Sequence, residues 1–138
     1  MTDAELAAHL AQVAGKILIE VRESGMFEGK ALGQAGDQTA NQFLVHALRE
    51  QRPEDGLLSE ESKDTAERLS KERVWIVDPV DGTREYGEER TDWAVHVALT
   101  IGGRPEVGAV ALPGLGLVLR SDRPSPLLPA AEKPRLVV

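Results

Sequence analysis

The sequence predicts an α+β fold in which two N-terminal helices pack on a largely antiparallel sheet. Three observations predict it. In two segments of the first 51 residues, apolar side chains recur every three to four positions, which is the helical period. From residue 57 onward, apolar side chains form short runs or alternate with polar ones, which is typical of strands. Helices that precede a run of strands, rather than alternating with it, indicate α+β architecture.

The first helix is expected over residues 3–24, where an apolar stripe consists of Leu6, Leu10, Val13, Ile17 and Val21. Thr2 and Glu5 have the spacing of a capping box, which would begin this helix. Residues 25–36 contain four glycines and are expected to form a loop that could include a short hairpin. A second helix is expected over residues 37–51.

Five strands are expected after the helices, at residues 57–58, 74–78, 92–101, 105–112 and 115–120. The third has alternate apolar residues on one side, namely Trp93, Val95, Val97 and Leu99. Gly102-Gly103 is a tight-turn signal between two of the strands. Residues 63–72 are highly charged and are expected to form a solvated face of one or two helical turns.

Composition excludes several classes of protein. The 138 residues suit one domain, and a net charge of −7 argues against a nucleic-acid-binding surface. No apolar stretch approaches the ~20 residues of a membrane span, so no stable membrane insertion is expected. The chain has no cysteine, which excludes disulfides and thiolate metal sites, and its start lacks a signal-peptide pattern. These features are compatible with a cytoplasmic enzyme.

Acidic residues follow two of the predicted strands. Asp78 and Asp81 follow the apolar run VWIV in the stretch VWIVDPVDGT, and Glu60-Glu61 come shortly after the short strand LL. If these strands are neighbours, the carboxylates meet at one edge of the sheet and repel each other. Protonation or a bound divalent cation would relieve that repulsion. Mg²⁺ prefers oxygen ligands, and the Val80 carbonyl could add one more. Asp-Pro-x-Asp-Gly is also a good turn sequence in its own right, so a plain surface turn remains an alternative.

The motifs LLSEES and WIVDPVDGT resemble the inositol monophosphatase superfamily of Mg²⁺-dependent, lithium-sensitive phosphatases. The family pattern is an acidic pair, a charged insert and then W-(I/V)-(I/V)-D-P-(I/L/V)-D-G-T. The resemblance covers the whole chain but only the first half of a family member. It implies the N-terminal domain of a sugar-phosphatase-like α/β/α/β/α sandwich. Residues 1–120 would be the metal- and phosphate-binding domain, and the proline-rich residues 121–138 a linker towards a C-terminal domain absent from this chain.

The resemblance assigns metal ligands among these residues. Glu60 matches a metal-ligand glutamate, and Asp78 would bridge two metal ions. The Val80 carbonyl would bind one of these ions and Asp81 the other. Two or three Mg²⁺ ions are implied, with Ca²⁺ or Li⁺ inhibitory.

Catalytic and phosphate-binding roles follow from the same resemblance. Thr83 and Glu60 would hold the nucleophilic water, and Glu60, Asp81, Gly82 and Thr83 would contact the substrate phosphate. Asp37 falls where the bisphosphate nucleotidase branch has a proton-acceptor aspartate. Asp37 also opens the second predicted helix, so an N-cap is an equal and compatible interpretation.

The run DGTREYGEE indicates the branch, since it is similar to CysQ-type 3′(2′),5′-bisphosphate nucleotidases. The implied substrate is 3′-phosphoadenosine 5′-phosphate or its sulfated form, which would give AMP or adenosine 5′-phosphosulfate and phosphate, in sulfur assimilation. Two departures stand out. The segment LGQAGD keeps only part of a family motif, and no W-D pair is present to supply the aspartate of the C-terminal domain. Inositol-1-monophosphatase or a related sugar phosphatase is one alternative, and an inactive fragment that needs its C-terminal half is another.

The remaining polar residues are expected to be structural or exposed. His9, His46 and His96 have no histidine or acid at metal-ligand spacing. Arg84 could contact a substrate phosphate, but a solvated pair with a nearby glutamate is favoured. A small-molecule phosphate substrate and the C-terminal domain are the expected partners. A homodimer is compatible with the sequence, which leaves the oligomeric state open.

Overall fold

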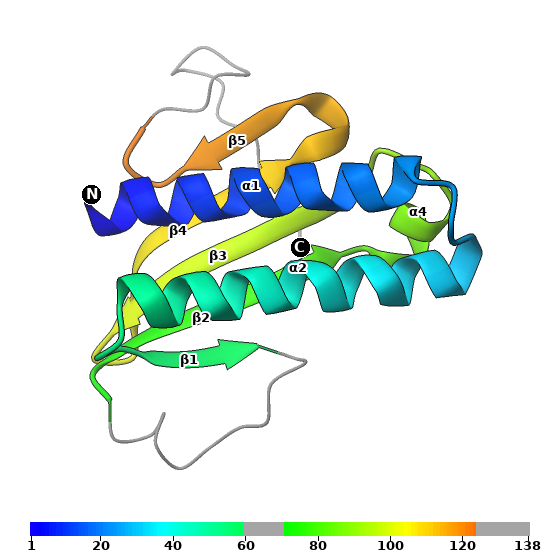
Figure 1. Cartoon of the computed structure of the whole chain (residues 1–138). Coiled ribbons are helices and arrows are strands. Elements are labelled where there is room, and N and C mark those ends of the chain that lie inside the picture. The colour runs from blue at the N-terminus through cyan, green and yellow to red at the C-terminus, as the bar shows by residue number, and fades with distance from the viewer. Residues whose placement is uncertain (60–70, 124–138) are drawn as a thin grey trace.

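The computed structural model describes residues 1–59 and 71–123, and it has the expected α+β fold (Figure 1). Helices α1 (Asp3–Glu23) and α2 (Gly29–Gln51) lie side by side on one face of a five-stranded sheet. The strands follow the chain in the order β1-β2-β3-β4-β5, with bounds Gly56–Ser59, Arg73–Asp81, Ala94–Ile101, Arg104–Leu112 and Leu117–Arg120. A short helix, α4 (Thr83–Gly87), follows β2, and a 3₁₀ turn (Pro113–Leu115) precedes β5.

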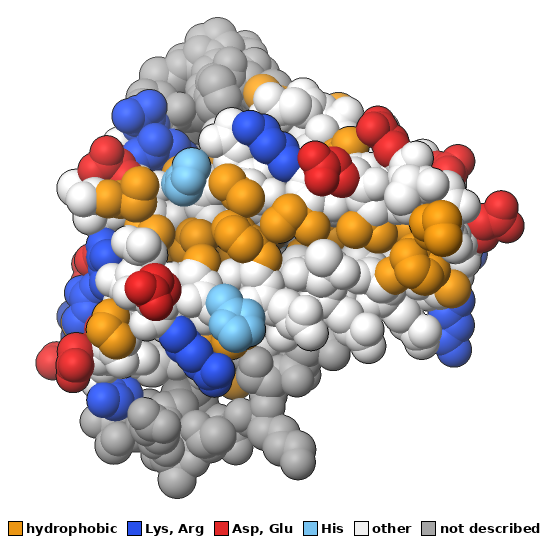
Figure 2. Space-filling model, viewed as in Figure 1, with side chains coloured by type: hydrophobic (Ala, Val, Ile, Leu, Met, Phe, Trp, Pro, Cys, Tyr) orange, Lys and Arg blue, Asp and Glu red, His pale blue; other side chains and the backbone are white. Residues whose placement is uncertain are grey.

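The sheet is mixed, because β1 pairs with β2 in parallel while the other pairs are antiparallel. Its helix-facing side forms the core with α1 and α2, through alternate residues that include Trp75, Val77, Val95, Val97, Leu99, Ala109 and Ala111. The expected alternation in the third strand is confirmed. On the outer surface, a band of hydrophobic side chains marks the seam between α1 and α2 (Figure 2).

The first helix begins as expected, since Thr2 and Glu5 form the capping box reciprocally. The expected tight turn is also confirmed, because Gly102 and Gly103 adopt positive φ between β3 and β4. Strand β5 ends at Arg120, the last residue of the predicted N-terminal domain. Residues 60–70 and 124–138 lie outside the described residues, so most of the predicted linker and most of the charged stretch 63–72 do too.

The predicted loop over residues 25–36 is wrong, because α2 already begins at Gly29. Gly29, Gly33 and Gly36 follow one another at spacings of four and three, so they share one helix face. A Cβ atom on Gly36 would lie 2.6 Å from the Tyr86 ring, and one on Gly33 would lie 3.2 Å from the Thr83 carbonyl oxygen. These glycines therefore let α4 approach the helix closely.

The same correction moves Asp37 into the interior of α2. The expected N-cap is therefore wrong, since Glu28 occupies that position and makes no side-chain capping bond. Asp37 is half-buried on the third turn of α2, in the half of the helix that carries the glycines.

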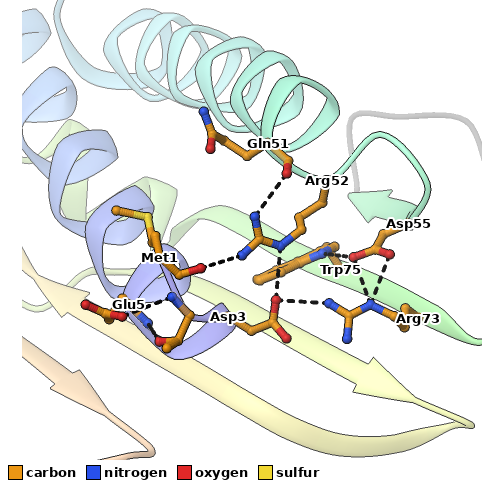
Figure 3. Close-up of polar contacts among 9 residues, drawn as sticks. Met1, Asp3, Glu5, Gln51, Arg52, Asp55, Arg73 and Trp75 are labelled. Atoms are coloured by element: carbon orange, nitrogen blue, oxygen red, sulfur yellow. Dashed lines mark hydrogen bonds and ion pairs between the residues drawn. The ribbon is translucent and has the colours of Figure 1, made fainter.

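A polar cluster joins α1, the end of α2 and the sheet where β1 and β2 begin, at the end of the sheet away from α4 (Figure 3). The Asp3 carboxylate accepts from Arg52 Nε at 3.1 Å and from Arg73 Nη2 at 2.9 Å. Asp55 accepts from Arg73 Nε at 3.0 Å and from Trp75 Nε1 at 2.8 Å. Partial burial of Asp3 opposes its ionised form, but the two arginines outweigh this effect and hold the pKa of Asp3 below its usual value.

Candidate active site at the end of strand β2

A β-bulge brings Asp78 and Asp81 to the same face of the sheet. In a regular strand, residues three apart point to opposite faces. Asp78 pairs with His96, but Asp81 pairs with Ala94, so three residues advance on β2 while two advance on β3. His96 and Ala94 are two apart and share a face, and directly paired residues share a face as well. Both carboxylates therefore belong to the far face of the sheet, which is the face opposite α1 and α2.

Asp81 has a partner that the sequence did not indicate. Its Oδ2 atom lies 3.0 Å from His96 Nε2, and the side chain of Asp81 remains 63% exposed. His96 and Asp81 are fifteen residues apart, so sequence spacing gave no sign of this pair. The contact depends on the bulge, which a count of residues along the chain does not reveal.

Gly82 turns the chain from β2 into α4. Its φ of 95° lies in the left-handed region, where a side chain would be strained. A Cβ atom there would also lie 3.3 Å from the Asp92 carbonyl oxygen. Thr83 begins α4, and Tyr86 N–H donates to the Gly82 carbonyl at 2.9 Å. The chain therefore turns tightly after Asp81 and continues directly as a short helix.

Helix α4 is held in place by Tyr86, which is fully buried. The Tyr86 hydroxyl donates to the Leu18 carbonyl at 2.6 Å, and Arg22 Nη2 donates to the Tyr86 carbonyl at 2.6 Å. The Arg22 guanidinium lies over the Tyr86 ring at 4.7 Å and over the Trp93 ring at 5.1 Å. Burial raises the pKa of Tyr86 to about 12, although Arg22 acts in the opposite direction. In the sequence, Tyr86 only helped to indicate the bisphosphate nucleotidase branch, and no pattern pointed to Arg22.

A cleft of about 470 Å³ lies between the N-terminal half of α2 and helix α4. Asp37 and Thr83, two of the three predicted catalytic residues, both line it. The remaining lining residues are Gly29, Lys30, Gly33, Gln34, Arg84, Gly87 and Glu88. Arg84 Nε donates to Glu88 Oε2 at 3.2 Å on the surface, so the favoured solvated pair is confirmed.

The first strand ends beside the two aspartates. Ser59 is buried at the end of β1 and pairs with Val77, the residue before Asp78. The strands before the two acidic motifs are thus neighbours, as the metal hypothesis required. Glu60 and Glu61 lie outside the described residues. Within 1–59 and 71–123, no three side chains of His, Asp or Glu gather as a complete metal site.

No helix among the described residues has the length and hydropathy that crossing a membrane requires.

Comparisons with known proteins show which family this chain resembles. The model of the inositol monophosphatase family matches residues 2–123. A 3′-phosphoadenosine 5′-phosphate phosphatase of Mycobacterium leprae is 53% identical over 134 residues, which cover 88% of this chain and 49% of the relative. A 3′(2′),5′-bisphosphate nucleotidase CysQ of Salmonella typhimurium is 32% identical and matches 80% of this chain and 48% of the relative.

Solved structures of inositol monophosphatases have a similar fold over this region. A crystal structure of a staphylococcal IMPase-II superposes with a TM-score of 0.77 at 26% identity, covering 88% of this chain and 44% of that one. The chain spans about half the length of the curated relatives that it matches. Because the family model spans nearly the whole described region, the chain belongs to the inositol monophosphatase family.

Proposed function

We propose that residues 1–120 form the metal- and phosphate-binding part of a Mg²⁺-dependent phosphomonoesterase. The proposed substrate is 3′-phosphoadenosine 5′-phosphate or its sulfated form. Hydrolysis of the 3′-phosphate would give AMP or adenosine 5′-phosphosulfate and inorganic phosphate. The name and 53% identity of the mycobacterial relative support this substrate class.

One observation carries the proposal. The bulge sets Asp78 and Asp81 on one face, and two residues later Thr83 enters a cleft that Asp37 also lines. Acidic oxygens for a cation thus directly precede, along the chain, a residue that lines a cleft suited to a phosphate ester, although neither Asp78 nor Asp81 lines that cleft. A plain surface turn would require neither a neighbouring parallel strand nor a bulge that turns both carboxylates to one face.

The donor set fits Mg²⁺. Asp78 and Asp81 would supply carboxylate oxygens, the Val80 carbonyl would supply a third, and Glu60 would complete the set contributed by this chain. All of these are hard oxygen donors, and the chain has no cysteine to supply a thiolate ligand. When bound, Mg²⁺ supplies charge neutralisation of the phosphoryl group and a lowered pKa of water.

The side chains of the chain itself would orient the reactants. The Thr83 hydroxyl, together with Glu60, would hold a water so that its oxygen faces phosphorus, opposite the departing 3′-oxygen. Asp37, on the other wall of the cleft, would accept the proton released by that water. Gly82 and Thr83 would hold the phosphate through their backbone at the point where β2 turns into α4.

A phosphate-release assay tests the proposal. The chain would be assayed alone and together with the C-terminal half of the mycobacterial relative, on 3′-phosphoadenosine 5′-phosphate, inositol 1-phosphate and fructose 1,6-bisphosphate. We expect the adenosine bisphosphate to be the best substrate, with activity dependent on Mg²⁺. Asp78→Asn should lower activity about 100-fold, equivalent to about 3 kcal/mol of transition-state stabilisation. Preference for inositol 1-phosphate would overturn the substrate, and full activity of Asp78→Asn would overturn the site.

A second candidate is a half-site without activity of its own. The observation that favours it is the coverage of only 49% of the mycobacterial relative. In that case residues 121–138 would act as a linker to the missing half, and the isolated chain would bind Mg²⁺ weakly. Calorimetric Mg²⁺ titration with and without the C-terminal half distinguishes the two candidates, and turnover by the isolated chain would exclude this one.

A further inference from the structure

We propose that His96 is a positioning residue, whose imidazole holds the Asp81 carboxylate in the orientation that receives the metal ion. The inference rests on the proposed function, because it concerns the same cation. It adds a residue that neither the motif nor the family comparison assigns a role.

The position of His96 on β3 relates it to both aspartates. Its backbone lies directly across the ladder from Asp78, and its Nε2 atom is 3.0 Å from Asp81 Oδ2. Val95 and Val97, on either side of it, are fully buried against the helices, so the strand is anchored on its other face. The imidazole therefore projects from a rigid strand towards a carboxylate at the end of the neighbouring one.

The chemistry fixes the direction of the hydrogen bond. An ionised carboxylate only accepts hydrogen bonds, so His96 Nε2 must carry a hydrogen and donate it. One oxygen of Asp81 is thus held by the imidazole, and Oδ1 is left to face a cation. Because the Asp81 side chain is 63% exposed, it would otherwise lose rotamer freedom when it binds metal. Partners that orient a metal-binding group in this way are typically worth 10–100-fold in metal affinity.

Direct coordination by His96 is the competing arrangement. It would require an Nε2 lone pair instead of an N–H group, and Mg²⁺ prefers oxygen to imidazole. The two arrangements therefore differ in the tautomer of one ring, which long-range ¹H–¹⁵N spectra of histidine report.

The first test uses the unmodified chain and Mn²⁺ as a paramagnetic substitute for Mg²⁺. The chain has three histidines, and His9 and His46 are exposed on α1 and α2, so they serve as internal controls. We expect substoichiometric Mn²⁺ to broaden the imidazole signals of His96 first. In the Mg²⁺-loaded protein, His96 should be the Nε2–H tautomer. Equal broadening of all three histidines, or the Nδ1–H tautomer with Mg²⁺ bound, would overturn the inference.

The second test measures Mn²⁺ affinity from the free-ion signal in electron paramagnetic resonance. We expect His96→Ala to weaken binding about tenfold. His96→Gln should recover most of this loss, because its amide nitrogen lies near the place of Nε2 and can donate. His46→Ala is the matched control and should leave the affinity unchanged. Unchanged affinity in His96→Ala would overturn the positioning role.

Asp81→Asn separates this inference from the proposed function. If Asp81→Asn abolishes binding while His96→Ala leaves it unchanged, the metal site stands and the role of His96 is refuted. If the unmodified chain binds no Mn²⁺, or if Asp81→Asn binds it normally, the proposed metal site itself fails, and the inference fails with it.

Discussion

Asp55 has a nearly buried carboxylate, with its side chain only 8% exposed. It accepts from Arg73 and from the indole of Trp75, so it joins the start of β1 to β2. Asp55→Ala would remove the acceptor of Arg73 Nε and of the buried indole N–H, while Arg73 Nη2 would keep Asp3. We expect a loss of about 3 kcal/mol in the free energy of unfolding, measured by urea denaturation.

Asp92→Ala is the matched control for that loss. Asp92 also pairs with an arginine, Arg90 at 2.7 Å, but its side chain is 55% exposed. Water replaces a lost partner at such a site, so we expect a change below about 1 kcal/mol. Equal losses in the two variants would show that burial does not govern the contribution of Asp55.

At the scale of elements, α4 depends on the burial of Tyr86 against α1 and α2. Burial raises the pKa of Tyr86 to about 12, above the value of about 10 in an unfolded chain. The folded state thus favours the neutral phenol. Its contribution to stability is fully present below pH 10 and is lost as the pH rises from 10 to 12. We expect the loss to be about 1 kcal/mol by pH 11 and about 2 kcal/mol by pH 12.

Urea denaturation of the unmodified chain and of Tyr86→Phe over this range isolates the effect. Lysine and arginine titration is common to both proteins, so the difference between their curves reports Tyr86. Parallel pH dependence in the two proteins would contradict a buried neutral phenol at this position.

The elements also show which features the sequence predicts and why. Strand alternation reports burial on one face, so the residues of β3 that face the core could be predicted from the chain alone. The start of α2 could not, because Gly33 and Gly36 resemble loop residues until Thr83 and Tyr86 pack against them. The contact between Asp81 and His96 likewise depends on a bulge. Both features depend on a partner that is distant in sequence, so local preference does not predict them.

At the scale of the whole molecule, the bulge concentrates negative charge on the far face of a sheet that already belongs to an acidic chain. The net charge is −7, and Asp78 and Asp81 share that face. A cation that binds there only in the folded state must raise stability by mass action. When Mg²⁺ exceeds its dissociation constant tenfold, the free energy of unfolding should rise by about 1.4 kcal/mol over the value in EDTA.

Asp78→Asn should lose this increment, because it removes one of the two charges that attract the ion. Sodium chloride at equal ionic strength is the control, since general screening of an acidic chain would stabilise both proteins alike. Urea denaturation in EDTA, sodium chloride and magnesium chloride therefore distinguishes a specific Mg²⁺ site from general screening by dissolved ions. An increment that survives in Asp78→Asn, or that sodium reproduces, would mean that the two aspartates do not bind the ion.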